Sequence, residues 1–153
     1  MKVYIASDHA GYDHKKVLFA FLTDELHLDV EDCGAYVLDP EDDYNSYILK
    51  AAQAVAQDPT NSRAVILGGS GQGEAMQANR VAGARAAVFY GGTMDIVRLA
   101  REHNDANILS IGARFVDVDR AKEAIKVWFD TKANDTEKYR RRVLSMDNQG
   151  LCN

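Results

Sequence analysis

The sequence predicts an α/β protein in which one sheet of five parallel strands is covered by helices on both faces. Two observations carry this prediction. Short β-rich or apolar runs alternate five times with stretches of helical periodicity along the 153 residues, and such alternation is typical of parallel sheets with crossover helices. The run RAVILG (63–68) is almost continuously apolar, as expected for a strand buried on both faces.

Strands are expected where a short run of β-branched, aromatic or other apolar residues is bounded by turn-forming residues. The first lies directly after Met1, and the other four follow at intervals long enough for one helix each. The expected strands are KVYIA (2–6), LDVED (28–32), RAVILG (63–68), ARAAVFY (84–90) and NILSIG (107–112).

The intervening stretches repeat their apolar residues with helical spacing. In the first helix, residues 12–26, the expected apolar face consists of Val17, Leu18, Phe21 and Leu22. In the helix at 117–131, the apolar side consists of Ala121, Ala124, Ile125 and Trp128. Further helices are expected at about 44–57, 71–81 and 93–103, and the stretch ANDTEKYRRRVLSM (133–146) predicts a last, basic helix.

The chain is predicted to form one domain, residues 1–153, because no linker, internal repeat or low-complexity segment interrupts the pattern. The expected architecture is a three-layer, Rossmann-like (flavodoxin-like) fold with a C-terminal basic helix. In such sheets ligands bind at the carboxyl ends of the strands, near a switch in strand order. This rule marks SDHAG (7–11), GGSGQGE (68–74) and the segment after the fifth strand that contains Arg114.

Composition excludes several classes of function. The net charge of −5 argues against a nucleic-acid binder, which would show a basic face. No apolar run approaches the roughly 20 residues of a membrane span, and the start MKVYIASDHAG lacks the pattern of a signal peptide. Cys33 and Cys152 are too few and too distant for a disulfide framework or a metal site. We therefore expect a cytoplasmic protein.

The stretch GGSGQGE (68–74) joins a predicted strand to a predicted helix with little more than backbone. Glycine lets the unpaired N–H groups at a helix start approach a ligand closely, so this geometry suits an anion. The loop lacks the Lys-Ser/Thr end of a Walker A motif and the GxGxxG spacing, so a nucleotide is weakly supported. The alternative is a tight turn without a ligand, in which Ser70 is only a helix cap.

Glu74 follows the glycine loop directly and is the candidate general base. A carboxylate in the first turn of a helix is also favoured by the helix dipole alone, without any catalytic role. The dipole lowers the pKa of a carboxyl group, whereas a general base is usually helped by a raised pKa. Partial burial beside an apolar helix would offset the dipole.

Charged residues elsewhere supply further candidates. Asp8 and His9 end the first strand, in the predicted crevice. His103 closes a helix just before the fifth strand, where it is either a favourable cation at a helix C-terminus or a proton donor. The last helix carries Lys138 and residues 140–142, all basic, which form either a solvated face or a site that captures a phosphate or carboxylate.

Several motifs in order resemble the family of ribose-5-phosphate isomerase B and the galactose-6-phosphate isomerase subunits. The resemblance runs from residue 2 to about residue 145. It is carried by SDHAGY (7–12), DCGAY (32–36), DDY (42–44), GGSGQGEAMQANRVAGAR (68–85), AREHNDANILSIGAR (100–114) and YRRRV (139–143). One branch of the family has a cysteine as its base, at the position of Gly68 here. The present sequence resembles the other branch, which has GGSGxGE and uses the glutamate.

The resemblance implies an aldose–ketose isomerase that interconverts ribose 5-phosphate and ribulose 5-phosphate through an enediolate, without cofactor or metal. Glu74 is then the base, and His103 is the acid that opens the sugar ring. Asp8, His9 and Asn104 are implied to bind the sugar, and Arg114, Lys138 and Arg142 the phosphate. The backbone amides implied to hold the developing oxyanion are those of Gly69, Ser70, Gly71, Gln72 and Gly73.

The resemblance also implies a homodimer or a dimer of dimers with active sites shared between subunits. His103, Asn104 and Arg114 would come from a neighbouring chain relative to Glu74. The partner is then a small sugar phosphate, with no nucleic acid and no membrane.

Some positions depart from the family pattern and bear on the choice of sugar. Lys138 stands where arginine is usual, Tyr139 replaces a common histidine, Asn45 replaces a proline, and the segment 90–103 is about two residues longer than expected. The same reaction on a tetrulose phosphate, allose 6-phosphate or galactose 6-phosphate is therefore one alternative. A non-catalytic phosphosugar-binding subunit and a nucleotide-binding flavodoxin-like module are the others.

Overall fold

A computed structural model describes residues 1–148 of the chain; Cys152 lies outside the described residues. Five parallel strands form one sheet in the order β2-β1-β3-β5-β4. Register pairs Ile5 with Val65 across β1 and β3, and Val65 with Leu109 across β3 and β5. The strands are β1 (Lys2–Ser7), β2 (Asp29–Asp32), β3 (Ser62–Gly68), β4 (Ala86–Phe89) and β5 (Ile108–Gly112).

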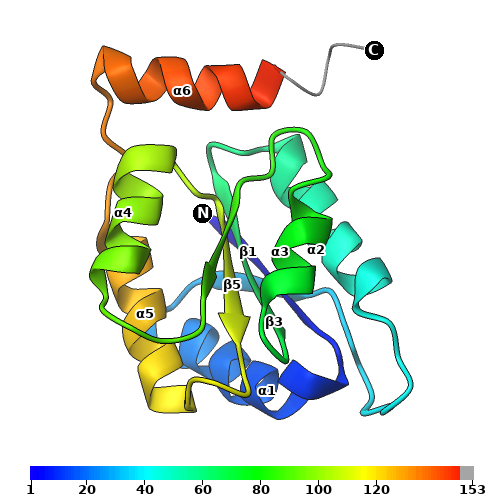
Figure 1. Ribbon diagram of the computed structural model, residues 1–153. Coiled ribbons are helices and arrows are strands. Elements are labelled where there is room, and N and C mark those ends of the chain that lie inside the picture. The colour runs from blue at the N-terminus through cyan, green and yellow to red at the C-terminus, as the bar shows by residue number, and fades with distance from the viewer. Residues whose placement is uncertain (149–153) are drawn as a thin grey trace.

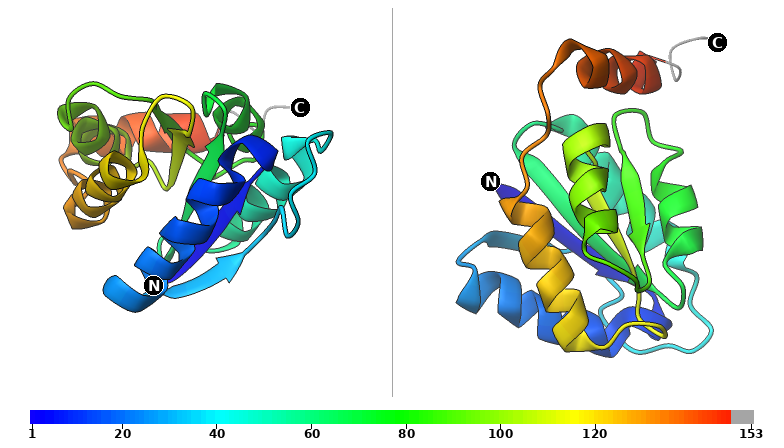
Figure 2. Two further views of the ribbon diagram at one scale, coloured as in Figure 1. Left: turned by 90° about the horizontal axis from the view of Figure 1, so that it is seen from below. Right: turned by 60° about the vertical axis from the view of Figure 1, so that its left-hand side comes forward.

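Helices cover both faces of the sheet, which gives three layers (Figures 1 and 2). One face is covered by α1 (Tyr12–Ala20), α4 (Asp95–Asn104) and α5 (Val118–Asp130), and the other by α2 (Tyr44–Gln57) and α3 (Gln72–Ala78). A short π-helix (Phe21–Glu25) continues α1. The basic helix α6 (Glu137–Asn148) lies beyond the end of the sheet opposite to the one at which the arrow of β5 points (Figure 1).

Two apolar clusters form the core, one on each face of the sheet. Burial of these side chains is the main stabilising contribution, at roughly 25 cal/mol per Å² of apolar surface. Trp128 of α5 is 1% exposed in the cluster that also contains Phe21 and Leu18. The second cluster joins the sheet to α2, with Ile48 fully buried. By contrast, α6 has no buried residue, so this helix adds nothing to the core of its own chain.

The predicted three-layer fold is confirmed, with differences in detail. The last two strands are exchanged relative to the flavodoxin order 2-1-3-4-5. Val17 is 45% exposed, because the buried stripe of α1 passes through Leu18 and Phe21 instead. The helix predicted over 71–81 ends at Ala78, since residues 79–83 form turns that include Gly83 at a φ of 84°. Within residues 1–148, no helix is both long and apolar enough to cross a membrane.

The topology brings three segments together at one edge of the sheet. Strand β3 lies between β1 and β5, so the carboxyl ends of these three strands are adjacent. The connection after β1 leads to β2 on one side of the sheet, and the connection after β3 leads to β4 on the other side. The boundary between β1 and β3 is therefore a switch point in strand order. The segments that follow these strands begin at Asp8, Gly69 and Ala113. These are the stretches that the sequence marks as candidate binding segments.

Candidate active site

The loop between β3 and α3 needs glycine for steric reasons. Gly71 has a φ of 76°, which is in the left-handed region that favours glycine. A Cβ at this position would also lie 3.0 Å from Ser110 Oγ of the neighbouring strand. The Ser110 hydroxyl donates to Gly71 O at 2.5 Å and fixes the loop against β5. The bare backbone is therefore required for the loop to lie this close to the sheet.

The two residues that follow β5 hold the loop in place through hydrogen bonds to its backbone carbonyl groups. Ala113 N donates to Gly68 O at 2.9 Å, and Arg114 N donates to Gly69 O at 3.1 Å. Within the described part of the chain, the N–H groups of residues 69–71 find no protein acceptor, and Gln72 N makes only a long 3.4 Å bond to Ser70 Oγ. Ser70 is thus at most a weak cap, and the loop amides are free to donate to a ligand.

Glu74 lies in the first turn of α3 and is 4% exposed. Its carboxylate occupies the space beside Gly68 that a Cβ there would fill, with both carboxyl oxygens and the carboxyl carbon as the nearest atoms. The glycine at position 68 therefore makes room for the carboxylate at the end of β3. This arrangement places a carboxylate beside the last residue of β3, where the loop with the unpaired amides begins.

The environment of Glu74 determines which of two opposing effects on its pKa prevails, the helix dipole or burial. Burial raises the pKa of the Glu74 carboxyl above its ordinary value. Its own backbone N–H donates to the carboxylate and lowers the pKa, and the negative charge of Asp8 raises it. Burial prevails, so the pKa shifts in the direction that suits a general base.

Asp8 and His9 follow β1 and are held by two different networks. The Asp8 carboxylate is 7% exposed and accepts from Ala10 N at 2.9 Å and Gly11 N at 3.2 Å. It thereby caps the short 3-10 turn that follows β1. His9 is tied instead to Asp42, whose Oδ1 lies 2.7 Å from the ring Nδ1. Both residues lie at the carboxyl edge, where the sequence predicts them.

Arg114 belongs to the same crevice as Glu74. Its guanidinium lies 3.4 Å from the position that a Cβ on Gly69 would take. Its positive charge also lowers the pKa of His9. The resemblance implied that Arg114 would reach the site from a neighbouring chain. This expectation is wrong, because β3 and β5 are paired neighbours and place Arg114 against the loop of its own chain.

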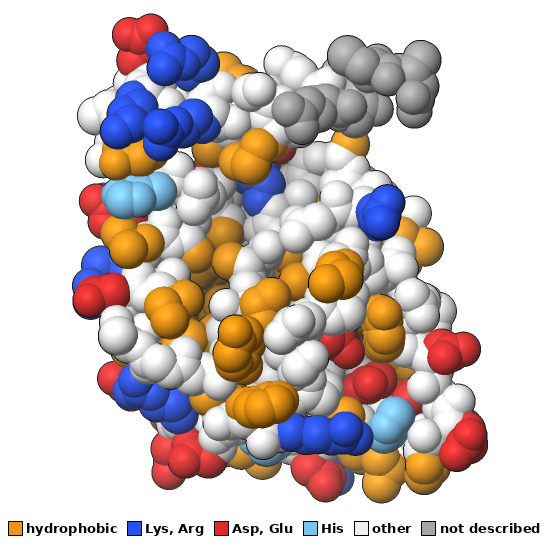
Figure 3. All heavy atoms as spheres, in the orientation of Figure 1, with side chains coloured by type: hydrophobic (Ala, Val, Ile, Leu, Met, Phe, Trp, Pro, Cys, Tyr) orange, Lys and Arg blue, Asp and Glu red, His pale blue; other side chains and the backbone are white. Residues whose placement is uncertain are grey.

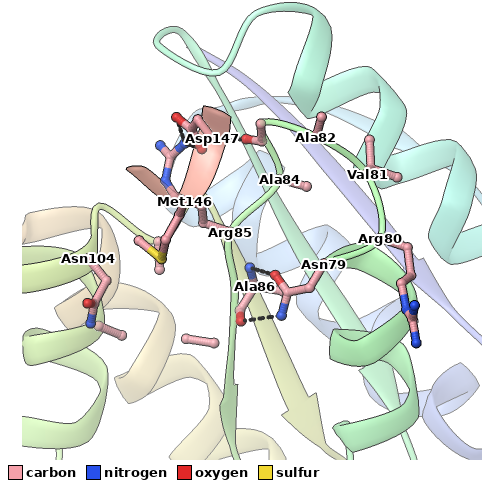
Figure 4. Close-up of a pocket in the computed structure, with 14 residues that line it drawn as sticks. Asn79, Arg80, Val81, Ala82, Ala84, Arg85, Ala86, Asn104, Met146 and Asp147 are labelled. Atoms are coloured by element: carbon pink, nitrogen blue, oxygen red, sulfur yellow. Dashed lines mark hydrogen bonds and ion pairs between the residues drawn. The ribbon is translucent and has the colours of Figure 1, made fainter. Parts of the chain in front are cut away.

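His103 and Asn104 lie at the other edge of the sheet. Helix α4 begins after the carboxyl end of β4 and ends just before β5 begins, so its last residues are at the amino edge. The His103 ring stacks on Tyr139 of α6, with centroids 4.6 Å apart and planes 7° apart. Asn104 is exposed and lines a cavity of ≈ 610 Å³ between α6 and residues 79–87 (Figure 4). The chain does not bring either residue to its own Glu74.

The basic residues of α6 are exposed and also lie away from the glycine loop. Lys138 and Arg142 have no ion-pair partner within residues 1–148. The helix is attached to its own body by Asp147, which accepts two 3.0 Å hydrogen bonds from Arg85, as Figure 4 shows. Lys138 and Arg142 are therefore available to bind an anion, but not in the crevice of their own chain.

One group of side chains has the donor set of a metal site. The donor atoms of Asp8, His9 and Asp42 lie within 4.8 Å of one another. His9 Nδ1, however, is already within hydrogen-bond distance of Asp42. The group is thus held together by a direct contact, and carboxylates of this kind are equally suited to bind hydroxyl groups of a sugar.

Two residues of the crevice had no role assigned from the sequence. Asp42 contacts His9, and the Tyr44 hydroxyl lies 2.8 Å from the position that a Cβ on Gly73 would take. Both residues belong to the motif DDY (42–44), which is the feature of the sequence that could have indicated their role. Its link to the crevice could not be inferred, because the motif lies 33 residues from His9 in the chain.

Comparisons with known proteins identify the family to which the chain is similar. The family model described as ribose/galactose isomerase matches residues 3–146. Ribose-5-phosphate isomerase B of Mycobacterium leprae is 37% identical over 143 residues, which cover 94% of this chain and 86% of the relative. A putative sugar phosphate isomerase of Bacillus subtilis, YwlF, is 35% identical over 132 residues, 86% of each chain.

Solved structures are similar over almost the whole chain. Ribose-5-phosphate isomerase B of Clostridium thermocellum is 34% identical and superposes with a TM-score of 0.88 over 97% of both chains. The enzyme of Mycoplasma genitalium, solved with bound ribulose 5-phosphate, is 26% identical and has a TM-score of 0.92, covering 99% of this chain and 97% of that one.

Proposed function

The chain belongs to the ribose/galactose isomerase family and is an isomerase, and we propose that it interconverts ribose 5-phosphate and ribulose 5-phosphate with Glu74 as the base. The observation that carries the proposal is the position of Glu74. Its buried carboxylate, with a raised pKa, lies against a loop whose amides are free to donate. A base beside preorganised donors is what removal of a proton next to a carbonyl requires.

The proposed reaction begins with the open-chain aldose. Glu74 removes the proton from C2, and the electrons of that C–H bond form the C1=C2 double bond of the enediolate. The electrons of the carbonyl π bond move to O1, which becomes negative. The loop amides donate to this oxyanion, and each such donor is typically worth about 3 kcal/mol of barrier. A proton passes from O2 to O1, and Glu74 returns its proton to C1. The product is the ketose, and all atoms and charges balance.

The remaining residues have supporting roles in this proposal. Asp8 and His9 bind sugar hydroxyls at the carboxyl edge, and Arg114 beside Gly69 binds phosphate with its forked donors. His103 protonates the ring oxygen to open the sugar, and Asn104 contacts the hydroxyls. Lys138 and Arg142 complete the phosphate site as exposed cations of α6.

Because His103, Asn104 and α6 lie at the opposite edge from Glu74, we propose that a second copy of the chain supplies them. Exposed apolar side chains on the outer surface of α3, α4 and the segment that follows β4 support a homodimer. They include Met76 at 65%, Tyr90 at 51%, Ile96 at 48% and Leu99 at 43% exposure. Figure 3 shows hydrophobic side chains gathered over the middle of this face. A patch of this kind usually marks an association surface.

A coupled assay of the purified protein on ribose 5-phosphate tests the reaction. Allose 6-phosphate, galactose 6-phosphate and a tetrulose phosphate are run beside it, because Lys138 and the long 90–103 segment lie in regions proposed to contact substrate. Turnover of ribose 5-phosphate that falls by about 10²–10⁴ in Glu74→Gln supports the proposal. Turnover within tenfold of the wild type would overturn the assignment of the base. A location in the cytoplasm belongs to the same proposal and is tested by cell fractionation.

A further inference from the structure

Asp42 makes two contacts with His9 through a single oxygen. Its Oδ1 accepts from the backbone N–H of His9 at 3.1 Å and lies 2.7 Å from the ring Nδ1. The Asp42 side chain is 5% exposed, whereas the His9 side chain is 30% exposed. Within residues 1–148, the second oxygen, Oδ2, is buried and has no hydrogen-bond partner. Burial of a carboxylate with so few hydrogen-bond partners lowers the stability of the fold. The contact of this carboxylate with His9 is therefore a candidate for a functional role.

The loop before α2 is built to present this carboxylate. Asp39, Pro40, Glu41 and Asp42 form a β-turn in which Asp42 N donates to Asp39 O at 3.1 Å. Asp39 Oδ1 also accepts from Glu41 N at 3.0 Å. Aspartate at the first position and proline at the second are the residues that this turn type favours. The turn therefore fixes the backbone of Asp42 independently of His9.

Resting on the function proposed above, we propose that Asp42 is a positioning residue for His9. Asp42 holds Nδ1 of the imidazole toward the protein, so that Nε2 is the nitrogen left to face the substrate. It also favours the charged form of the ring, in which Nε2 carries a hydrogen and acts as a donor. Asp42 does not touch the substrate in this arrangement and acts only through His9.

The charges around His9 agree with this role. The hydrogen bond to Asp42 is the largest influence and raises the pKa of His9, while partial burial lowers it. The negative charge of Asp8, adjacent in the chain, raises the pKa further, and Arg114, from the segment after β5, lowers it. Without Asp42, the charged neighbours of the ring would be the anion Asp8 and the cation Arg114, whose effects on its pKa oppose each other. The carboxylate of Asp42 is thus the strongest of the influences on the pKa of the ring.

The test is Asp42→Asn, which keeps an oxygen to accept from His9 N but removes the charge. Glu41→Gln is the matched control, because Glu41 is the adjacent, exposed carboxylate and makes no side-chain contact with His9. We expect the His9 ring, followed by NMR without substrate, to titrate at lower pH in Asp42→Asn and at unchanged pH in Glu41→Gln. An unchanged His9 titration in a folded Asp42→Asn protein would overturn the proposal.

Steady-state kinetics supply a second measurement. Loss of the contact that orients the ring and favours its charged form predicts a rise in KM of about tenfold, with kcat changed much less. In a His9→Gln background, Asp42→Asn should add no further rise in KM, whereas a separate structural role for Asp42 would add one. The ring titration needs no turnover, so a failure of the proposed isomerase activity and a failure of the positioning role remain distinguishable.

The wild-type protein gives a measurement that does not depend on any variant folding. Nitrogen chemical shifts of the His9 ring report which nitrogen carries the hydrogen in the neutral form. We expect hydrogen on Nδ1, directed at Asp42. Hydrogen on Nε2 alone at a pH above the ring pKa would contradict the orientation that we propose.

Discussion

His103 and Glu74 lie at opposite edges of the same sheet. Glu74 follows the carboxyl end of β3, whereas His103 precedes the amino end of β5, the strand paired with β3. The five residues of β5 (Ile108–Gly112) span about 15 Å at the rise of a strand, which is far beyond the reach of one substrate contact. An active site that uses both residues must therefore take them from two chains.

Mixed dimers test this consequence. Glu74→Gln and His103→Asn should each be nearly inactive as homodimers. After equal amounts are dissociated and mixed, half of the dimers should be heterodimers, each with one intact site and one doubly defective site. Random reassociation therefore predicts recovery of about a quarter of the wild-type activity. No recovery, with heterodimers confirmed by mass spectrometry, would show that the two residues do not share a site across chains.

Gly68→Ala should displace the Glu74 carboxylate, because the new methyl group would occupy the same space. A base misplaced by about 1 Å can cost on the order of 10²-fold in rate, so we expect kcat to fall by that order with KM changed little. The effect should nearly vanish in a Glu74→Gln background, where the base is already absent. An undiminished kcat in Gly68→Ala, with the fold checked by circular dichroism, would contradict the contact.

The pH dependence of kcat/KM should report the burial of Glu74. Only the ionised carboxylate accepts a proton, so activity should fall as the pH drops through the raised pKa of Glu74 in the free enzyme. The acid limb should therefore lie above the range of an ordinary glutamate, about 4.3. A pH–rate profile between pH 4 and 9 measures it. An acid limb at the pKa of an ordinary glutamate would argue against burial of the catalytic carboxylate.

The same raised pKa predicts that Glu74 lowers the stability of the folded protein near neutral pH. A carboxyl group with a raised folded-state pKa stabilises the fold below its unfolded pKa, and this contribution is lost as the pH rises through the folded pKa. Glu74→Gln should therefore unfold at a higher temperature than the wild type at pH 7. The difference should shrink as the pH falls through the raised pKa toward that of an ordinary glutamate, and thermal melts at neutral and at acid pH measure it.

Tyr139 should position His103 through the parallel stack of the two rings. Aromatic pairs contribute roughly 0.5–1.5 kcal/mol beyond area burial. Tyr139→Leu should consequently lower kcat by about two- to tenfold, while Tyr139→Phe, which keeps the ring, should stay near the wild type. Equal losses in both variants would indicate that the tyrosine hydroxyl, rather than the stack, is the important feature.

The fold was predictable because burial and periodicity agree along most of the chain. The run 63–68 is apolar and forms the central strand β3, and the expected helix at 44–57 has the bounds of α2. Val17 was misplaced because it lies at the margin of the apolar stripe of α1, where the neighbouring Leu18 takes the buried position. Strand order could not be read from the chain, since the exchange of β4 and β5 leaves the alternation of elements unchanged.

The site was predictable where its residues follow strand ends. Asp8, Gly69 and Arg114 lie within two residues of the ends of three strands that pair side by side, so the topology brings them together. The contact of Asp42 with His9 depends on the path of an irregular segment between β2 and α2, which has no periodic pattern to read. Burial of Glu74 likewise depends on packing, and only the structure shows that it outweighs the helix dipole.

The mutual exclusion of a side chain at position 68 and the carboxylate of Glu74 has an evolutionary consequence. Any side chain at the end of the third strand would require the space that the Glu74 carboxylate fills here. A chain with this backbone can therefore hold a side chain at position 68 or a glutamate carboxylate in this space, and not both. A substitution of Gly68 and the loss of the Glu74 carboxylate from this position are thus coupled events in any change of this sequence.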